Sequence, residues 1–394
     1  TELRAENVFL RKENAELKDK INLNSRNSSI PSSKELYKQK RSEKKSSGRK
    51  RGAQPGHKGH YRKDQEPNEI VEVELEDKSC ECGGEFCKAG DPEVQQKVDI
   101  PKIEPYIINY VLNYYRCNKC GVHKKAKLPP GVTADVFGYN VKTIIAALTT
   151  FYKNSKRDVQ KILLDVFNVE ISLGCISNNE GRVSKKCQEA YENVESEVQN
   201  GTLVHMDETG HRKGEKKGWC WFFGTTTSSL IKLADSRGMK VLAESVFGKD
   251  DNIIVSDRYA AYNYFNEENR QICWAHLSRD FEKFAGSTHE EVKRYGIYLN
   301  DISRELFALK KALLAEEVEI LFFLRRVKKL RRRSLKYLNE ISYIDGLKQA
   351  PGMAKQMLKS ESMMWRFMYA PYEIPLTNNH AERQIRHYVV YRKN

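Results

Sequence analysis

Hydrophobic residues change their spacing several times along the chain, and each spacing predicts a different unit. In residues 1–24, leucines recur every seven positions, and asparagine or isoleucine stands four positions after each. This arrangement is typical of a short parallel coiled coil, in which a buried asparagine fixes the register of the two helices. A solvated amphipathic helix is the alternative. The residues of the pattern are Leu3, Leu10, Leu17, Asn7, Asn14 and Ile21.

The next three segments each have a different pattern. Residues 25–68 are rich in Ser, Lys, Arg and Gly, which predicts a basic flexible linker. In residues 69–130, "EIVEVEL" and "YIINYVLNYYRC" alternate apolar and polar positions and predict strands of a small β unit. Residues 138–200 hold three runs with helical periodicity. The short break at "VEIS" resembles a helix-turn-helix corner, although a plain helical packing unit fits equally well.

From residue 201 the pattern alternates between strands and helices. "TLVHM", "GWCWFFGT" and "SLIKLAD" predict an antiparallel meander, and "NIIVSD" predicts a fourth, buried strand after a helix at "MKVLAESVFG". "RQICWAHLSRDFEKF" follows as a short strand and a helix. Residues 286–376 are almost wholly helical, and a last helix begins at Asn378 or Asn379. The predicted fold class is multidomain α+β, with a mixed-sheet domain over 201–285 and 377–394 and a helical insertion over 286–376.

Charge adds a candidate partner. The net charge is +15, and residues 34–63 alone hold 12 Lys and Arg against 2 acids. Such a distribution favours DNA or RNA over a small metabolite, although solubility alone also accounts for a basic chain. A second basic run is "RRVKKLRRRSLK". The candidate nucleic-acid contacts are Lys44, Lys45, Arg49, Lys50, Arg51, Lys58, Arg325, Arg326, Arg331, Arg332 and Arg386.

The chain has no run of about 18 apolar residues and no visible secretory signal, so no membrane partner and a cytoplasmic location are expected. It holds nine cysteines, five of them between positions 80 and 120. Clustered cysteines in such a chain favour metal ligands over a disulfide framework. The motif "CNKCG" is a zinc knuckle, and with an earlier cysteine cluster it predicts a zinc ribbon that binds one structural Zn²⁺. The expected ligands are Cys82, Cys117 and Cys120 with either Cys80 or Cys87, and free thiols are the alternative.

Three acidic residues stand at positions where burying a carboxylate is unfavourable or where an acid is unusual. Asp207 follows the first predicted strand of the sheet, Asp257 follows the fourth, and Glu382 lies in the first turn of the last helix. The first and fourth strands of such a sheet are neighbours, so both aspartates emerge at one edge. Three converging carboxylates need a cation, and oxygen ligands suit two Mg²⁺ or Mn²⁺ ions, which together promote in-line phosphoryl transfer. Singly, each acid has an ordinary alternative as a turn or helix-cap residue, with Asn379 and Glu382 forming a capping box.

Other residues near these acids receive simpler interpretations. Glu208 is expected to be a supporting or solvent-facing neighbour of Asp207. Cys273 and His276, three positions apart, are expected to form a structural hydrogen-bonding element more than a metal site. The tryptophans of this region are expected in the core and not stacked on bases; they are Trp219, Trp221 and Trp274.

The blocks "HMDETG", "VSDRYAAYN", "CWAHLSRDF" and "NNHAERQIR" resemble those of the insertion sequence sixty-six family of transposases, the TnpC type. The resemblance covers nearly the whole chain in the same order, including "LRAENVFLRKENAELK", "QPGHKGH" and the cysteine region. It implies a leucine zipper, a zinc-binding domain and a ribonuclease H-like catalytic domain of the DDE type. Asp207, Asp257 and Glu382 match its triad, and residues 286–376 its helical insertion. The first zinc knuckle departs from the family pattern, which leaves the fourth ligand open.

The predicted function is therefore that of a DNA transposase, which hydrolyses DNA at terminal inverted repeats and joins the freed 3′-hydroxyl to target DNA. The coiled-coil pattern predicts a homodimer or higher oligomer. The resemblance further implies small accessory proteins of the same element, and a bacterial, nucleoid-associated location is expected. A structure-selective nuclease that uses the same site is one alternative. A catalytically silent DNA-binding regulator is another, and the intact set of acids argues against it.

Overall fold

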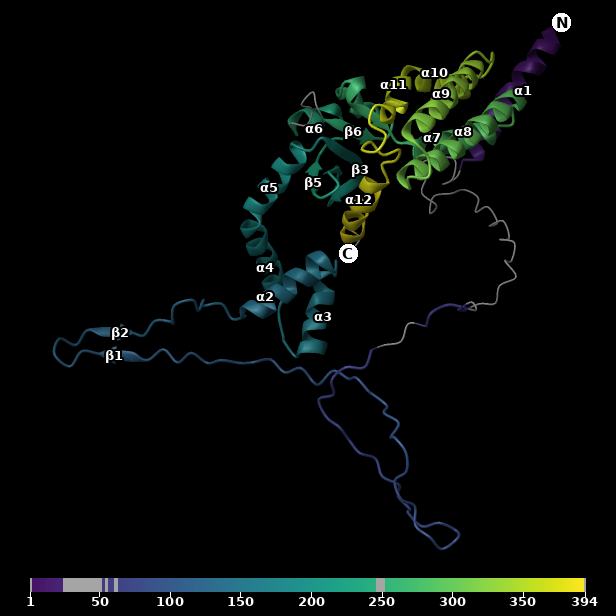
Figure 1. Cartoon of the computed structure of the whole chain (residues 1–394). Helices are drawn as coiled ribbons and strands as arrows, with labels where there is room; N and C mark the ends of the chain where they lie inside the picture. The colour runs from purple at the N-terminus through teal and green to yellow at the C-terminus, as the bar shows by residue number, and fades with distance from the viewer. Residues whose placement is uncertain (1, 24–51, 54–55, 60–62, 246–251, 393–394) are drawn as a thin grey trace.

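The computed structural model describes residues 2–23, 52–53, 56–59, 63–245 and 252–392 (Figure 1). In chain order these are an N-terminal helix, an extended cysteine-rich segment, a small helical unit, and an α/β domain that carries a bundle of long helices. None of the helices described is long and apolar enough to cross a membrane. Most of the predicted basic linker, with Lys44, Lys45, Arg49, Lys50 and Arg51, lies outside the described residues.

The central sheet has five strands in the order β5-β4-β3-β6-β7. The first three in sequence, β3 (Leu203–Lys213), β4 (Lys216–Gly224) and β5 (Ser229–Ala234), form an antiparallel meander. The strand β6 (Ile253–Ser256) pairs in parallel with β3, and β7 (Arg270–Ile272) pairs in parallel with β6. β3 is thus the central strand, and the predicted adjacency of the first and fourth strands is confirmed.

The two faces of the sheet are covered by different helices, because successive side chains of a strand point to opposite faces. Trp221 and Phe223 of β4 enter a core with α5 (Gln188–Gln199), α6 (Met239–Glu244) and the 3₁₀ turn η3 (Ala260–Tyr264). Phe222, between them, packs on the other face against the last helix, α12 (Asn379–Tyr391). A short 3₁₀ turn, η4 (Glu267–Asn269), leads into β7.

The predicted insertion is a bundle of helices beside the sheet (Figure 1). It consists of α8 (Glu290–Leu314), α9 (Ile320–Ser342), α10 (Gln349–Lys359), α11 (Glu361–Met364) and the turn η5 (Arg366–Met368). Its apolar faces share one core with α7 (Trp274–Ala285). α7 and α8 pack closely at Gly296, where an added Cβ would stand 2.2 Å from the backbone nitrogen of Ala285. The bundle is fixed to the sheet by Trp274, whose indole Nε1 donates to the Met364 carbonyl over 2.7 Å.

The helical unit before the sheet contains α2 (Tyr139–Ala146), which continues as a π-helical turn, η2 (Ala147–Phe151). It is followed by α3 (Lys156–Phe167) and α4 (Leu173–Lys186). Ser155 and Ser172 cap α3 and α4 through their hydroxyls, as expected for residues that accept free backbone N–H groups. The long third run of the sequence is two helices, α4 and α5, divided at Cys187. The buried core of the unit consists of Ile145, Val159, Leu163, Ile171 and Ile176.

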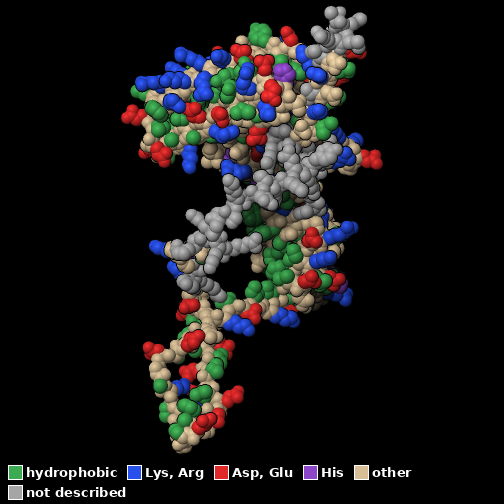
Figure 2. All heavy atoms as spheres, turned by 90° about the vertical axis from the view of Figure 1, so that its right-hand side faces the viewer, with side chains coloured by type: hydrophobic (Ala, Val, Ile, Leu, Met, Phe, Trp, Pro, Cys, Tyr) green, Lys and Arg blue, Asp and Glu red, His purple; other side chains and the backbone are tan. Residues whose placement is uncertain are grey.

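The strands predicted in the cysteine-rich segment are mostly wrong. Only β1 (Tyr114–Arg116) and β2 (His123–Lys125) form, as a short antiparallel hairpin, while residues 69–75 and 106–113 form no strand. Their apolar side chains are exposed, among them Val73 at 90% and Ile107 at 78%. Alternation alone does not make a strand without a surface to pack on, and a segment this small cannot bury enough apolar area by itself. Figure 2 shows hydrophobic side chains on the protruding loop below the main body.

The N-terminal helix α1 (Glu2–Ile21) lies along the helical bundle. The Asp19 carboxylate accepts hydrogen bonds from the Ser287 hydroxyl and the Thr288 backbone N–H, at 2.7 and 2.9 Å. Glu16 accepts from the backbone N–H groups of Lys348 and Gln349 at the start of α10, which lowers the pKa of the Glu16 carboxyl. The proposed coiled-coil positions are left on another face, where Leu10, Leu17 and Ile21 are exposed. The coiled coil itself stays a prediction.

Candidate active site at the edge of the sheet

Two of the three candidate acids lie on neighbouring strands. The pairing of β6 with β3 ends at His205, which lies opposite Val255, so Asp207 stands just past the paired stretch. Asp257 directly follows β6. The prediction that β3 ends at Asp207 is wrong, since β3 continues to Lys213 and Asp207 pairs with Phe222 of β4. β3 loses its neighbour on one side only, and the acid lies at that opening.

The third acid comes from the last helix. Glu382 lies in the first turn of α12, which packs against β3 and β4. Its carboxylate Oε1 is 3.8 Å from His276 Nε2 and 3.9 Å from Arg279 Nη2, both on α7. The capping-box alternative is wrong, because the N-cap of α12 is Asn378 and not Asn379. Arg386, one turn beyond Glu382, is exposed.

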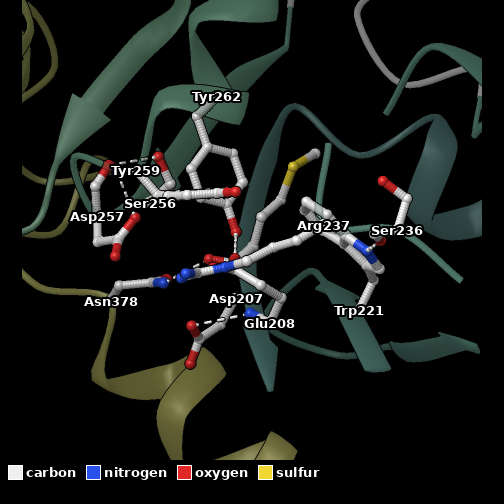
Figure 3. Close-up of polar contacts among 11 residues, drawn as sticks. Asp207, Glu208, Trp221, Ser236, Arg237, Ser256, Asp257, Tyr259, Tyr262 and Asn378 are labelled. Atoms are coloured by element: carbon white, nitrogen blue, oxygen red, sulfur yellow. Dashed lines mark hydrogen bonds and ion pairs between the residues drawn. The ribbon is translucent and has the colours of Figure 1, made fainter. Parts of the chain in front are cut away.

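The acids act on one another through their charges. The pKa of the Asp207 carboxyl is raised to about 8, mainly because burial penalises its ionised form. The negative charges of Glu208, Asp257 and Glu382 raise it further, while a 2.9 Å hydrogen bond from the Glu208 N–H opposes the shift. Asp257 Oδ1 accepts a 2.8 Å hydrogen bond from the Tyr259 N–H (Figure 3). The site therefore gathers like charges in a place where water screens them poorly.

Glu208 is a buried member of this site and not a solvent-facing one, with its side chain 1% exposed. Arg237 donates to its carboxylate from both Nε and Nη2, at 2.9 and 2.5 Å, and the Tyr262 hydroxyl donates to the other oxygen (Figure 3). The Arg237 guanidinium stacks on the Tyr259 ring, with its carbon 3.7 Å from the ring centroid. Glu208 is thus held in an ion pair with Arg237.

A buried asparagine connects the elements that carry the acids. Asn378 Nδ2 donates to the Met206 carbonyl over 2.6 Å, and its Oδ1 lies 2.9 Å from His205 Nδ1. Its backbone N–H donates to the Cys273 sulfur over 3.1 Å. Cys273 is therefore a structural hydrogen-bonding residue, as predicted. Burial lowers the pKa of the His205 imidazole to about 4, so this ring is neutral.

Sequence patterns identified Asp207, Asp257 and Glu382 but not the residues that support them. Tyr262 lies within the block "VSDRYAAYN" and Asn378 within "NNHAERQIR", and this was the only available signal for them. Arg237 follows a turn whose sequence gives no signal of a functional residue. Two of the three tryptophans are buried as expected, namely Trp221 and Trp274, and Trp219 is partly buried beneath Arg237.

The donor set fits hard divalent cations. No three His, Cys, Asp or Glu side chains in the described ranges stand close enough to hold one metal ion in their present conformations. The residues present are nevertheless oxygen donors from three parts of the chain, and the negative charges of Asp257 and Glu382 add to the effect of burial in raising the pKa of Asp207. Oxygen ligands of this kind suit Mg²⁺ or Mn²⁺. Asp207, Asp257 and Glu382 are the residues that would hold the ions.

The candidate zinc ligands form two separate groups. The Cys82 and Cys80 sulfurs are 3.4 Å apart in a tight turn closed by a bridge between Ser79 and Glu85. Cys117 precedes the turn that leads to β2, where Gly121 adopts a φ of +74°. Hydrogen bonds from the backbone N–H groups of Cys120 and Lys119 lower the pKa of the Cys117 thiol. The two groups belong to loops that extend in different directions (Figure 1), and Cys87 is exposed.

The basic run of α9 divides into two sets of side chains. Arg326 and Arg331 form ion pairs, with Glu305 of α8 and Glu361 of α11 respectively. Arg325 and Arg332 are exposed and form no ion pair within the part of the chain that the structure describes. Figure 2, seen from the side of the helical bundle, shows Lys and Arg gathered on the upper body. Lys58 is exposed as well.

Comparison with known proteins identifies the class of the chain. A model of the family described as "Transposase IS66 family" matches residues 156–394, and a model of the zinc-finger binding domain of transposase IS66 matches residues 77–121. Residues 1–63 match a family of unknown function. The search of curated proteins found no match. The chain is thus a transposase of an insertion sequence, with a zinc-binding domain, and acts on DNA.

More particularly, the chain belongs to the IS66 transposase family, because the family model covers more than half of it. This confirms the family predicted from the four sequence blocks.

The electrostatics of the site predict that Mg²⁺ stabilises the fold more strongly as the pH rises. The folded pKa of Asp207, about 8, lies above the usual value of about 3.9, so the folded state binds a proton that the unfolded state has lost. In protein without metal, stability therefore falls between about pH 4 and pH 8, at most by ~1.4 kcal/mol per pH unit. A bound cation replaces that proton.

We expect the rise in melting temperature on adding Mg²⁺ to be larger near pH 8.5 than near pH 6, and Asp207→Asn to abolish the difference. Thermal unfolding with EDTA and with Mg²⁺ at both values checks this. An equal rise at both values in the unmodified chain would contradict it.

Proposed function

We propose that the chain cleaves DNA at the terminal inverted repeats of its insertion sequence and joins the freed 3′-hydroxyl to target DNA, with Asp207, Asp257 and Glu382 as its catalytic acids. The observation that supports this most is the parallel pairing of β3 with β6, which puts both aspartates at one opening of the sheet. Glu382 lies near the same opening, because it stands in the first turn of α12, which packs against β3 and β4, and its charge adds to those that raise the pKa of Asp207. The strand order, with three antiparallel strands and then two parallel ones, supports a ribonuclease H-like fold.

The residues of the site divide the work of phosphoryl transfer. Two Mg²⁺ or Mn²⁺ ions, when bound, supply Lewis acidity at the attacking and leaving oxygens of an in-line displacement. Asp207, Asp257 and Glu382 would hold the ions, while Glu208 is engaged by Arg237 and Tyr262. A water or a 3′-hydroxyl attacks the phosphorus, and a 3′ oxygen leaves. The same site would serve a nuclease, so strand-transfer products distinguish a transposase from that alternative.

Conservative replacement of each acid tests the proposed triad. We expect Asp207→Asn, Asp257→Asn and Glu382→Gln each to reduce Mg²⁺-dependent cleavage by at least about 10³-fold, because each swap removes a charged ligand and keeps its shape. Binding of the element's own ends, measured without metal, should persist. Asp235→Asn is the matched control, since Asp235 is an exposed acid directly after β5 of the same sheet.

Cleavage within about threefold of the unmodified chain in any of the three variants would remove that residue from the triad. Cleavage without joining of a pre-cut end would favour the nuclease.

We further propose that one structural Zn²⁺ is held by Cys82, Cys117 and Cys120 with Cys80, or with Cys87 in its place. All five cysteines lie within the matched zinc-finger segment. Amide hydrogen bonds that lower the pKa of Cys117 favour the thiolate that zinc requires. Bringing the two groups together would give the segment the cross-link that its exposed apolar residues do not provide.

Metal analysis of purified protein should give about one equivalent of zinc. Cys117→Ser should lose it, and Cys187→Ser, at an exposed cysteine between α4 and α5, should keep it. Zinc retained in full by Cys117→Ser would contradict the ligand set.

The exposed cations of α9 are proposed to contact DNA phosphates. Arg325 and Arg332 are seven residues apart, two helical turns along one face, and Lys329 and Lys336 continue the same exposed stripe. Such residues bind phosphates without reading bases. The basic segment 34–63, with Lys58 in its described part, and Arg386 beside the acids are proposed to contact the phosphate backbone in the same way. Base reading is assigned to α3 and α4, whose arrangement fits the helix-turn-helix alternative.

Two double variants separate the two sets of α9 side chains. Arg325→Gln with Arg332→Gln should flatten the slope of log K against log salt by about two units, equally for end and random duplexes. Arg326→Gln with Arg331→Gln is the matched control, because both of these arginines are held in ion pairs. The control should leave the slope nearly unchanged. The reverse result would show that the ion pairs open and that the other face binds DNA.

Dimerisation through α1 is proposed from its two faces. Glu16 and Asp19 hold the helix on the bundle, while Leu10 and Leu17 remain exposed for a second copy. In the heptad, Glu16 and Asp19 occupy positions opposite the apolar seam. The two contacts are therefore compatible.

A further inference from the structure

Asn378 occupies an unusual place in the fold. It is the N-cap residue of α12, but its side chain is directed to the neighbouring strand β3 and not to its own helix. The residue is 2% exposed, and both ends of its amide are used, one on the Met206 carbonyl and one on His205. Burying an amide is favourable only when its hydrogen bonds are satisfied, and here they are.

The directions of these hydrogen bonds are mutually determined. Asn378 Nδ2 donates to a carbonyl, so Oδ1 must accept, and His205 must carry its proton on Nδ1. β6 pairs with β3 only as far as His205. The Asn378 amide thus extends the hydrogen bonding of β3 by one residue, at the point where the strand partner ends. Only a side chain with a donor and an acceptor in one plane can make both contacts.

Short paths lead from Asn378 to all three acids. Asp207 directly follows Met206, whose carbonyl Asn378 binds. Glu382 lies one turn into α12, and its backbone N–H donates to the Asn378 carbonyl over 3.2 Å.

The third path runs through Cys273. Asn378 donates its backbone N–H to the Cys273 sulfur, and the Cys273 N–H donates to the carbonyl of Ser256, the residue before Asp257, over 2.9 Å. Each of the three acids therefore lies next to, or one helical turn from, a residue that Asn378 contacts directly or through Cys273.

We infer that Asn378 is a positioning residue for the acid triad: it sets the separation of Asp207, Asp257 and Glu382 and does not itself contact metal or DNA. This rests on the proposed function, since it concerns the same three acids. Supporting groups of this kind orient metal ligands, and their loss typically weakens metal binding or activity by about 10- to 100-fold. A difference of about 1 Å at the ligands is enough for such an effect.

Asn378→Ser tests the inference, because serine still suits an N-cap but cannot reach both Met206 and His205. Binding of Mn²⁺ without DNA, followed by electron paramagnetic resonance, is the first measurement, and it does not depend on cleavage. We expect the Mn²⁺ dissociation constant to rise at least about 10-fold. Cleavage per folded molecule should fall by a similar factor and recover partly at high Mn²⁺.

Asn379→Ser is the matched control, since Asn379 is the next residue of the chain and is exposed. It should leave both quantities within about twofold of the unmodified chain. If Asn378→Ser does not fold, His205→Phe removes the donor to Asn378 Oδ1 from β3, leaves the Met206 contact in place and leaves the sequence of α12 unchanged. It should weaken Mn²⁺ binding by about threefold or more.

Wild-type Mn²⁺ affinity in folded Asn378→Ser, or in His205→Phe when the first variant is unfolded, would overturn the inference. A loss of cleavage explained wholly by a lower folded fraction would assign Asn378 a structural role only and would also overturn it. Failure of the proposed function looks different, because the unmodified chain itself would then bind Mn²⁺ without cleaving DNA, or Asp207→Asn would bind it normally.

Discussion

Parallel pairing of β3 with β6 brings two aspartates to one opening of the sheet, and the rest of the α/β domain is arranged around these two like charges. Burial and neighbouring negative charges disfavour the ionised form of Asp207 and raise its pKa to about 8. Arg237 forms an ion pair with Glu208 and Tyr262 donates a hydrogen bond to it, so the other three acids are the ones proposed to bind cations. Glu382 and the two aspartates carry charges of the same sign and do not attract one another, and α12 comes long after β3 and β6 in the chain. Other contacts must therefore hold α12 at a fixed distance from these strands.

Much of this could be predicted because the sheet and its helices have strong periodicity. Asp257 directly follows β6, as the pattern indicates, and the strand order makes β3 the neighbour of β6. The end of β3 was predicted wrongly, since polarity after Met206 marks the loss of one neighbouring strand and not the end of the strand itself. Arg237 and Asn378 were not predicted, because their partners are distant in sequence and no local pattern reports such a contact.

Local pattern also fails where a segment has nothing to pack on. Residues 69–75 and 106–113 alternate as strands do, yet Val73 and Ile107 are exposed, because the period of a sequence specifies a face but not the surface that covers it. The basic run of α9 shows a related limit. Its composition marks it as cationic, whereas its helical period and the positions of Glu305 and Glu361 decide which arginines are available to a partner.

The place of Glu382 in the chain has a consequence for how the protein is made. Ribosomes synthesise a chain from its N-terminus, and domains generally fold as they emerge. The basic segment, the helical unit and both aspartates are complete before the helical bundle is translated, and α12 follows the bundle. If these parts contact DNA as proposed, a nascent or prematurely ended chain holds DNA with only two acids in place. Under the proposed mechanism, cutting becomes possible only once translation has passed the bundle, so that incomplete chains bind DNA without cutting it.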